Sequence, residues 1–196
     1  MLNLKLQEQI FPQLKQALNS ERSQEFGRRL YRLELDHQNY WVKLQHKHVS
    51  AQHELSFINE INKYQNIHQL NGGILAPHRV LDVNNLEHRA IENAIPSLLI
   101  VHELAPLFDV ASAQLSLDAI KSVFLRSLEV LEKLHDLGYI HGDLKVEHFR
   151  AFENRAVLID FEQCVDLNHL VTQENTATPR YMAPELFHGE AKTVQT

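Results

Sequence analysis

The sequence predicts an α+β fold in which strands come first and helices follow. Three observations carry this prediction: apolar and charged residues alternate over Leu30–Leu35, a long helical pattern covers Asp118–Leu137, and a short apolar run covers Ala156–Asp160. Alternation with a period of two is typical of a half-buried strand, and recurrence every three or four residues is typical of an amphipathic helix. A strand-rich half followed by a helical half is the order expected of an α+β domain.

Further elements are expected in the first half of the chain. A turn-forming cluster, Asp36–Asn39, joins the first strand to a partner strand. Pro12 favours the start of a short N-terminal helix. The remaining expected elements are strands over Tyr40–Gln45, Ile74–Val83 and Ser97–Leu104, and a helix over Gln52–Tyr64, in which Leu55, Ile58 and Ile61 recur at helical spacing.

The long helix over Asp118–Leu137 gives the strongest periodic signal. Its apolar residues fall on one stripe, formed by Ile120, Phe124, Leu128, Leu131 and Leu134. Such a stripe normally faces the core of a globular protein, so we expect these five side chains to be buried. Gly138 is a suitable residue to end the helix.

Composition limits the classes of function. The chain has 196 residues, of which 44% are hydrophobic and 22% charged, and this balance is typical of a folded domain. A formal net charge of −6 argues against a nucleic-acid partner. Cys164 is the one cysteine, which excludes an internal disulfide and a cysteine-rich zinc site and fits a reducing compartment. Since no apolar run is long enough to span a bilayer, we expect a cytoplasmic protein without a transmembrane segment.

Two aspartates after the long helix carry the chemistry. Asp143 lies in the segment Ile140–Phe149, and Asp160 ends the apolar run Ala156–Asp160. One carboxylate can orient an attacking hydroxyl and accept its proton, while the other can hold the metal ion that bridges phosphate groups. The pattern therefore indicates phosphoryl transfer.

At these residues the sequence resembles the protein-kinase superfamily. His141-Gly142-Asp143-Leu144-Lys145 is similar to its catalytic loop, Asp160-Phe161-Glu162 to its metal-binding motif, and Thr178–Glu185 to the end of its activation segment. The resemblance implies that Asp143 is the catalytic base and that Lys145 neutralises the transferring phosphoryl group. It also implies that Asp160 is a metal ligand.

The resemblance assigns a nucleotide site as well. Lys43 would contact the phosphates of ATP, with Glu54 as its carboxylate partner in preference to Glu60. The backbones of Glu103 and Ala105 would hydrogen-bond adenine.

Four departures from the family pattern stand out. Gly27 is the one glycine where the family has a glycine-rich loop, and the resemblance implies that it contacts the nucleotide. Gly142 replaces the arginine that responds to phosphorylation of the activation loop. His148 replaces an asparagine that binds the second metal ion, as in some lipopolysaccharide and Kdo kinases. Glu162 replaces a glycine and adds a carboxylate next to Asp160.

The resemblance implies one two-lobed protein-kinase-like domain over 1–196, with a short or truncated helical C-lobe. The N-lobe with its N-terminal helix would span 1–102 and the partial C-lobe 103–196.

The expected activity is that of a serine/threonine kinase that uses ATP with Mg²⁺, or Mn²⁺ in its place, on a protein substrate. Two alternatives stay open: a lipopolysaccharide or sugar kinase, and a pseudokinase that binds nucleotide or protein. Apolar residues near Leu186 and Phe187 suggest self-association through the short C-lobe.

Overall fold

The computed structural model describes residues 12–13, 30–35, 37–46, 51–70, 73–82, 94–108, 116–167, 178–181 and 184. The chain divides into two compact units. Unit 1 comprises Met1–Phe57 and Pro77–Glu103, and unit 2 comprises Ile58–Ala76 and Leu104–Thr196. The boundary at Glu103 lies next to the one predicted between the lobes, whereas Ile58–Ala76 groups with the second unit. That 1–196 forms a single domain stays a prediction.

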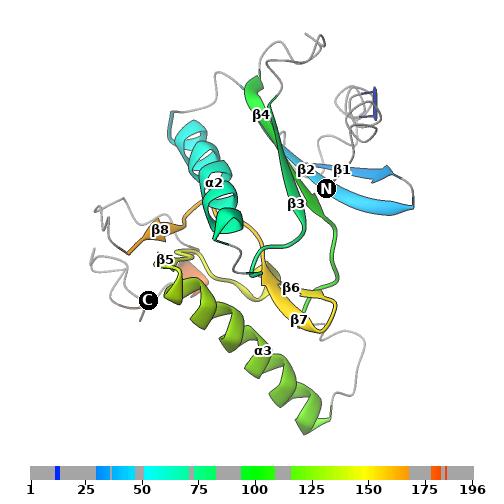
Figure 1. Ribbon diagram of the computed structural model, residues 1–196, viewed down its shortest axis with the longest axis vertical. Coiled ribbons are helices and arrows are strands. Elements are labelled where there is room, and N and C mark those ends of the chain that lie inside the picture. Colours follow the sequence, from blue (N-terminus) through cyan, green and yellow to red (C-terminus); the bar gives the residue numbers. More distant parts are fainter. Residues whose placement is uncertain are drawn as a thin grey trace. The chain divides into compact units, whose positions relative to one another are not determined.

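Unit 1 contains a four-stranded antiparallel sheet (Figure 1). Its strands are β1 (Leu30–Leu35), β2 (Gln38–His46), β3 (His78–Asp82) and β4 (Ala94–His102), arranged in the order β1-β2-β4-β3. The predicted strands are confirmed, although β3 begins four residues later than the apolar run Ile74–Val83 suggested. Ile74, Leu75 and Ala76 instead belong to unit 2, where Leu75 forms a parallel bridge with Leu158.

The hairpin of β1 and β2 explains which sheet face is buried. Leu35 pairs with Gln38, so the connection is tight, and His37 adopts a φ of 63° within it. Tyr31, Leu33 and Leu35 alternate with exposed Arg32 and Glu34. Because successive side chains of a strand point to opposite faces, this alternation leaves the charged side chains of β1 on the face away from the core.

Helix α2 (Ala51–Gln69) extends further than the predicted Gln52–Tyr64. Two of the residues that predicted it, Leu55 and Ile58, are 67% and 38% exposed. Its buried face is formed instead by Phe57, Glu60, Ile61, Tyr64 and Ile67. The predicted helix is therefore confirmed, but the row of side chains that it buries lies next to the row that contains Leu55 and Ile58.

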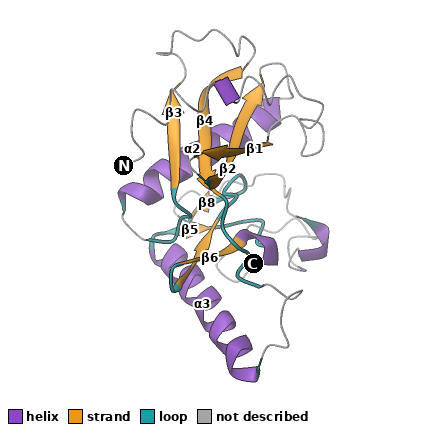
Figure 2. Cartoon of the chain, turned by 90° about the vertical axis from the view of Figure 1, so that its right-hand side faces the viewer, coloured by secondary structure: helices purple, strands orange, loops and turns teal. Residues whose placement is uncertain are grey.

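Unit 2 is built around helix α3 (Leu117–Asp136) and short strands (Figure 2). Ser116 caps the helix, since its side-chain oxygen accepts a hydrogen bond from the Ala119 N–H at 3.2 Å, and Gly138 follows its end with a φ of 84°. The other elements are β5 (Tyr139–Ile140), η2 (Val146–His148), β6 (Phe149–Phe152), β7 (Arg155–Leu158), β8 (Val165–Asp166) and η3 (Pro179–Tyr181). Strand β5 pairs with β8, and β6 pairs with β7.

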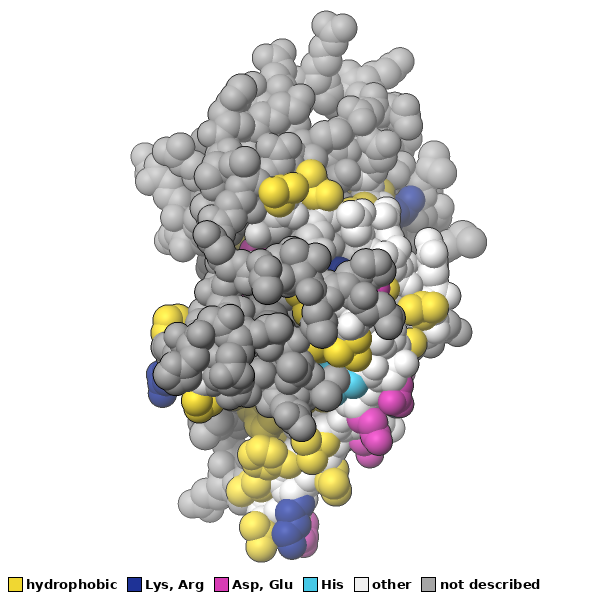
Figure 3. Space-filling view, turned by 90° about the vertical axis from the view of Figure 1, so that its left-hand side faces the viewer, with side chains coloured by type: hydrophobic (Ala, Val, Ile, Leu, Met, Phe, Trp, Pro, Cys, Tyr) yellow, Lys and Arg dark blue, Asp and Glu magenta, His cyan; other side chains and the backbone are white. Residues whose placement is uncertain are grey.

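The expectation that the whole apolar stripe of α3 is core was wrong. Leu134 is fully buried, but Phe124 is 56% and Leu128 60% exposed. The buried side chains are Ser127, Val130 and Leu134, and the helix packs on β5 and β7. Within the described residues the exposed large apolar side chains of α3 lie between Leu117 and Leu128, and apolar side chains gather on the surface towards the N-terminal end of the helix (Figure 3).

Two expectations fall partly outside the described residues. Of the N-terminal helix predicted from Pro12, residues 12–13 are described, and both are helical. Leu186 and Phe187, on which the expectation of self-association rested, lie outside the described residues. Within the described part of the chain, no helix combines the length and hydropathy needed to cross a bilayer.

Candidate active site

Asp143 lies in the loop between β5 and η2, and both of its carboxylate oxygens are engaged. The Lys145 Nζ lies 2.9 Å from its Oδ2. The backbone N–H of Thr178 donates to its Oδ1 with an N···O distance of 2.7 Å. Gly142, with a φ of 80°, supplies the left-handed backbone that a side chain would disfavour at this turn. The structure thus brings together the two residues predicted to be catalytic and adds Thr178.

These contacts keep Asp143 ionised. Burial by itself would raise the pKa of Asp143, but the hydrogen bonds from Lys145 and Thr178 hold the pKa below its ordinary value of 3.8. A carboxylate that accepts such hydrogen bonds is stabilised in its charged form. Asp143 is therefore a proton acceptor over the whole physiological pH range.

Asp160 lies after β7, opposite His148. The His148 Nε2 is 3.3 Å from Asp160 Oδ2, so the structure places the two predicted metal ligands side by side. The backbone holds this arrangement, because the Ile159 N–H donates to the His148 carbonyl at 3.1 Å. Asp160 has a φ of 66°, which is uncommon for a non-glycine residue and is typical of functional sites.

Two glutamates join Asp160 to form a cluster of carboxylates. One oxygen from each of Glu60, Asp160 and Glu162 lies within 4.8 Å of the others. Carboxylate oxygens are the ligands that Mg²⁺ prefers, and a neighbouring imidazole also suits Mn²⁺. The side chains present therefore fit a divalent cation, with Asp160 and His148 as its predicted ligands.

Helix α2 fixes the segment that carries Asp160. Glu60 is 1% exposed, and its Oε1 accepts a hydrogen bond from the Phe161 N–H at 3.3 Å. The amide of Asn59 donates to the carbonyls of Glu162 and Cys164, at 3.0 Å each. Sequence reasoning missed Asn59, because a polar residue within an amphipathic helix looks solvent-exposed until its partners are known.

His141, in the catalytic loop, contacts the segment that carries Asp160. Its Nε2–H donates to the Ile159 carbonyl at 3.1 Å, and its ring stacks on His148 with centroids 5.3 Å apart. Burial, assisted by His148, lowers the pKa of His141 to about 4, so the imidazole is neutral. The Phe161 ring lies 5.1 Å from His141 and 5.2 Å from Tyr64. The catalytic loop, the Asp160 segment and α2 are thereby locked together.

The predicted nucleotide-binding residues are placed as follows. Lys43 lies on β2 and is half-buried. The Glu103 N–H donates to the Asn39 carbonyl, and the Ala105 carbonyl accepts from the Ala151 N–H, both at 2.9 Å. A contact with adenine would therefore have to use the Glu103 carbonyl and the Ala105 N–H. Gly27 and the side chain of Glu54 lie outside the described residues.

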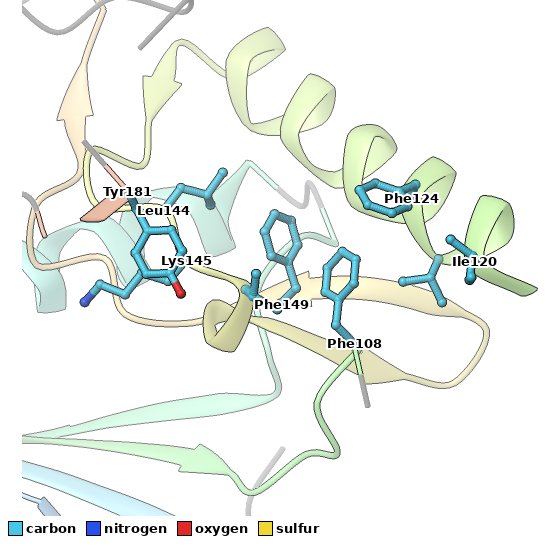
Figure 4. Close-up of a pocket in the computed structure, with 9 residues that line it drawn as sticks. Phe108, Ile120, Phe124, Leu144, Lys145, Phe149 and Tyr181 are labelled. Atoms are coloured by element: carbon cyan, nitrogen blue, oxygen red, sulfur yellow. The ribbon is translucent and has the colours of Figure 1, made fainter. Parts of the chain in front are cut away.

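An apolar pocket of about 540 Å³ lies beside Lys145 (Figure 4). The N-terminal half of α3, the catalytic loop and η3 all contribute to its walls. The lining side chains include Phe108, Ile120, Phe124, Leu144, Phe149 and Tyr181. Because Tyr181 closely follows Thr178, the segment that contacts Asp143 also forms part of this pocket.

Curated relatives of the chain include two proteins named as kinases. It is 36% identical over 69 residues to the Rho-associated protein kinase let-502 of Caenorhabditis briggsae, a match that covers 33% of this chain and 6% of the relative. It is 28% identical over 137 residues to the serine/threonine-protein kinase MPS1 of Encephalitozoon cuniculi, covering 66% of this chain and 21% of the relative. A match to the muscle M-line assembly protein unc-89 of Caenorhabditis elegans is 30% identical over 128 residues, covering 63% of this chain and 2% of the relative. The chain thus spans a small part of these relatives.

Solved structures and family models give a consistent result. The Cydia pomonella granulovirus kinase PK-1 shares the fold with a TM-score of 0.58 and 19% identity, over 95% of this chain and 67% of that one. The two-lobed kinase fold predicted from the sequence is thereby confirmed. The family model described as the protein kinase domain matches residues 35–196. Together with the paired Asp143 and Lys145 and the Asp160 segment, this match shows that the chain belongs to the protein kinase domain family.

Proposed function

We propose that the chain transfers the γ-phosphate of ATP to a serine or threonine hydroxyl of a protein, with Mg²⁺ as the metal ion. The observation that carries this proposal is the contact of Asp143 with Lys145 at 2.9 Å, in a loop that also receives Thr178. A carboxylate kept ionised next to a fixed ammonium group is the arrangement that phosphoryl transfer to a hydroxyl needs.

The chemistry follows from the charges of these two residues. Asp143 accepts a hydrogen bond from the acceptor hydroxyl and takes its proton as the oxygen attacks the γ-phosphorus. The Lys145 ammonium neutralises negative charge on the phosphoryl oxygens during transfer, and the bond to the β-phosphate oxygen breaks. Asp160 and His148 would hold the divalent ion, which supplies positive charge to the phosphates. In this proposal Lys43 contacts the phosphates of ATP, and its pairing with Glu54 stays a prediction.

A protein acceptor is favoured by the position of Thr178. Its backbone approaches Asp143 in the activation-like segment Thr178–Glu185, so a polypeptide already occupies the space next to the base. A peptide substrate that passes alongside this segment could present its hydroxyl to the same carboxylate. The relative from Encephalitozoon cuniculi is named a serine/threonine-protein kinase, which agrees with this choice. The single, buried Cys164 is compatible with the cytoplasm as the compartment.

A sugar or lipopolysaccharide acceptor is the second candidate. It is favoured by the His148–Asp160 contact of 3.3 Å, since the resemblance to lipopolysaccharide and Kdo kinases rests on a histidine at this position. A pseudokinase is the third candidate, and binding of ATP without transfer of phosphate would identify it.

One experiment separates these candidates. Thermal-shift titrations with ATP, in the presence of Mg²⁺ or Mn²⁺, measure nucleotide binding, and transfer of labelled γ-phosphate measures turnover. We expect stabilisation by ATP with metal and labelling of a mixed protein substrate such as casein. Labelling of a lipopolysaccharide acceptor but not of protein would favour the sugar kinase, and stabilisation without any transfer would show a binding module.

A further inference from the structure

We propose that the chain pairs with a second copy of itself through an exposed apolar face of α3, with the two helices antiparallel. The sequence suggested self-association from residues near Leu186 and Phe187, whereas this proposal rests on α3 alone. It does not depend on the proposed function, because it concerns a surface and not the catalytic residues. Of the ten large apolar side chains that the described residues leave exposed, five lie in the first twelve residues of α3: Leu117, Ile120, Phe124, Leu125 and Leu128.

Four of these residues form one line along the helix, which we call the exposed α3 face. They recur at spacings of three and four residues, so their side chains lie above one another on one side of α3. These four are Leu117, Ile120, Phe124 and Leu128. The side of α3 that packs on β5 and β7 is a different one, since it carries the buried Ser127, Val130 and Leu134. Exposed apolar patches of this kind mark interaction sites.

The charges beside the exposed α3 face fit an antiparallel second copy. Lys121 lies four residues after Leu117, and Glu132 lies four residues after Leu128. Both charged side chains are exposed, and because the two steps are the same, both lie on the same flank of the face. In an antiparallel pair with two-fold symmetry this flank meets the same flank of the second copy, so Lys121 lies opposite Glu132 of that copy.

A parallel pair would lose these ion pairs. The charged flank would then meet the other flank of the second copy, which contains Ser127 and Leu131, three residues after Phe124 and Leu128. Neither of these side chains carries a charge. Complementary charge across an interface favours one orientation over another, so the pattern on α3 selects the antiparallel pair.

The apolar residues select the same register as the charges. Phe124 and Leu128 lie two residues on either side of Arg126, while Lys121 and Glu132 lie five residues before and six residues after it. An antiparallel pair centred near Arg126 therefore brings Phe124 opposite Leu128 of the second copy. It also brings the opposite charges level to within about one residue, a rise of about 1.5 Å. Each of these contacts occurs twice because of the two-fold axis.

The apolar pocket beside Lys145 adjoins this face. Ile120 and Phe124 belong to the exposed α3 face and also line the pocket of about 540 Å³, where they point towards Phe108 and Phe149 (Figure 4). An apolar side chain of the second copy that lies next to Phe124 therefore meets a concave surface as well as the helix. Apolar anchors that enter such concave surfaces contribute most of the binding energy of protein interfaces.

Sedimentation velocity of the full chain at concentrations from about 1 to 300 µM gives the first measurement. One pair of helices buries less than the roughly 1,600 Å² of a typical stable complex, so we expect a monomer–dimer equilibrium with a dissociation constant on the order of 10 µM. In dilute protein the monomer predominates, and Leu128 is then exposed. A monomer at every concentration would overturn the proposal, and so would growth beyond the dimer, because a two-fold interface closes.

Variants of α3 test the apolar contact and the ion pairs separately. Leu128→Glu should weaken the dimer by at least about 10-fold, because it brings a carboxylate next to Phe124 of the second copy. Lys121→Glu should weaken it by about 5-fold, since two ion pairs are lost. The double variant Lys121→Glu/Glu132→Lys exchanges the charges and should recover the wild-type affinity. Lys133→Glu makes the same change of charge away from the exposed α3 face and should leave the dimer unchanged.

The recovery in the double variant distinguishes this arrangement from non-specific association. If the double variant dimerises no better than Lys121→Glu, Lys121 and Glu132 do not meet and the antiparallel pair is overturned. If Leu128→Glu dimerises as well as the wild type, α3 is not the interface. Far-UV circular dichroism and the melting temperature of dilute protein show that each variant is folded, and none of these measurements requires ATP or turnover.

Discussion

The Thr178 N–H donates to Asp143 Oδ1 at 2.7 Å, while the Lys145 ammonium lies 2.9 Å from the other carboxylate oxygen. The acceptor hydroxyl must therefore use a remaining lone pair of the same carboxylate. This arrangement fixes the orientation of Asp143 before a substrate arrives, which lowers the cost of positioning during catalysis.

His141 should make the stability of the protein sensitive to acid. Its pKa of about 4 in the folded state lies below the ordinary value of 6.5, so the unfolded chain binds a proton first as the pH falls. The free energy of unfolding should therefore decrease between pH 6.5 and 4, by roughly 3 kcal/mol in total. Urea denaturation at several pH values, in EDTA to remove metal ions, measures this slope.

The matched variant is His141→Phe, which keeps a ring but cannot be protonated. It should lose stability at pH 7 because the hydrogen bond to Ile159 is absent, and its stability should vary less between pH 6.5 and 4. An unchanged slope in this variant would show that other groups cause the acid sensitivity.

Two leucines of α3 should differ sharply in their effect on stability. Leu134 is fully buried, whereas Leu128 is 60% exposed. Leu134→Ala should lower the free energy of unfolding by about 2–5 kcal/mol, and Leu128→Ala by less than about 0.5 kcal/mol. Both substitutions are the same and lie in one helix, so helix propensity cancels. Equal losses in chemical denaturation would mean that the side chain of Leu128 is covered in the folded protein.

Glu60 and Glu54 should contribute unequally to phosphoryl transfer. Glu60→Ala removes the acceptor of the Phe161 N–H and so loosens the segment that carries Asp160. The loss of a hydrogen bond of about 1.5 kcal/mol that holds the Asp160 segment corresponds to a fall of about 10-fold in turnover with saturating ATP. Glu54→Ala, which removes the predicted partner of Lys43, should instead raise the ATP concentration needed for half-maximal turnover and change turnover at saturating ATP less. Turnover of Glu60→Ala equal to that of the wild type would show that Glu60 does not hold the Asp160 segment in place.

His148 should control the choice of metal ion. Imidazole is a softer ligand than a carboxylate or an amide oxygen, so the wild type should use Mn²⁺ as well as Mg²⁺. His148→Asn should retain activity with Mg²⁺ and use Mn²⁺ less well than the wild type does, and His148→Ala should need a higher concentration of either ion. Activity is titrated against each metal, with His68→Ala on the exposed side of α2 as a control. Identical metal curves for His148→Ala and the wild type would exclude His148 as a ligand.

Local patterns in the sequence were sufficient to predict β1, β2, β4, α2 and α3 and, with shifted bounds, β3 and β7. Strand alternation depends on neighbouring residues alone, and Asp143 and Lys145 are close in the chain, so their contact needs little knowledge of tertiary structure. The approach of His148 to Asp160 was implied by the family resemblance and agrees with the structure. The nucleotide contacts of Lys43, Glu103 and Ala105 remain predictions.

The misjudged features depend on packing between distant segments. Asn59 and Glu60 bind the backbone of residues about a hundred positions later, and helical periodicity does not reveal such partners. The apolar stripe of α3 predicted burial along its whole length, but which part of an amphipathic face is covered depends on the elements that reach it. In the described residues α3 packs on β5 and β7 and Leu134 is fully buried, whereas Leu128 stays exposed.

The most direct test of the central claim is the substitution Asp143→Asn, measured by transfer of γ-phosphate from ATP to a protein substrate. The amide keeps the size of the side chain but cannot take the proton of the acceptor hydroxyl, so transfer should fall by about 100-fold or more. The same variant should still bind ATP with Mg²⁺, as measured by thermal shift. Turnover close to that of the wild type would contradict the assignment of Asp143 as the catalytic base.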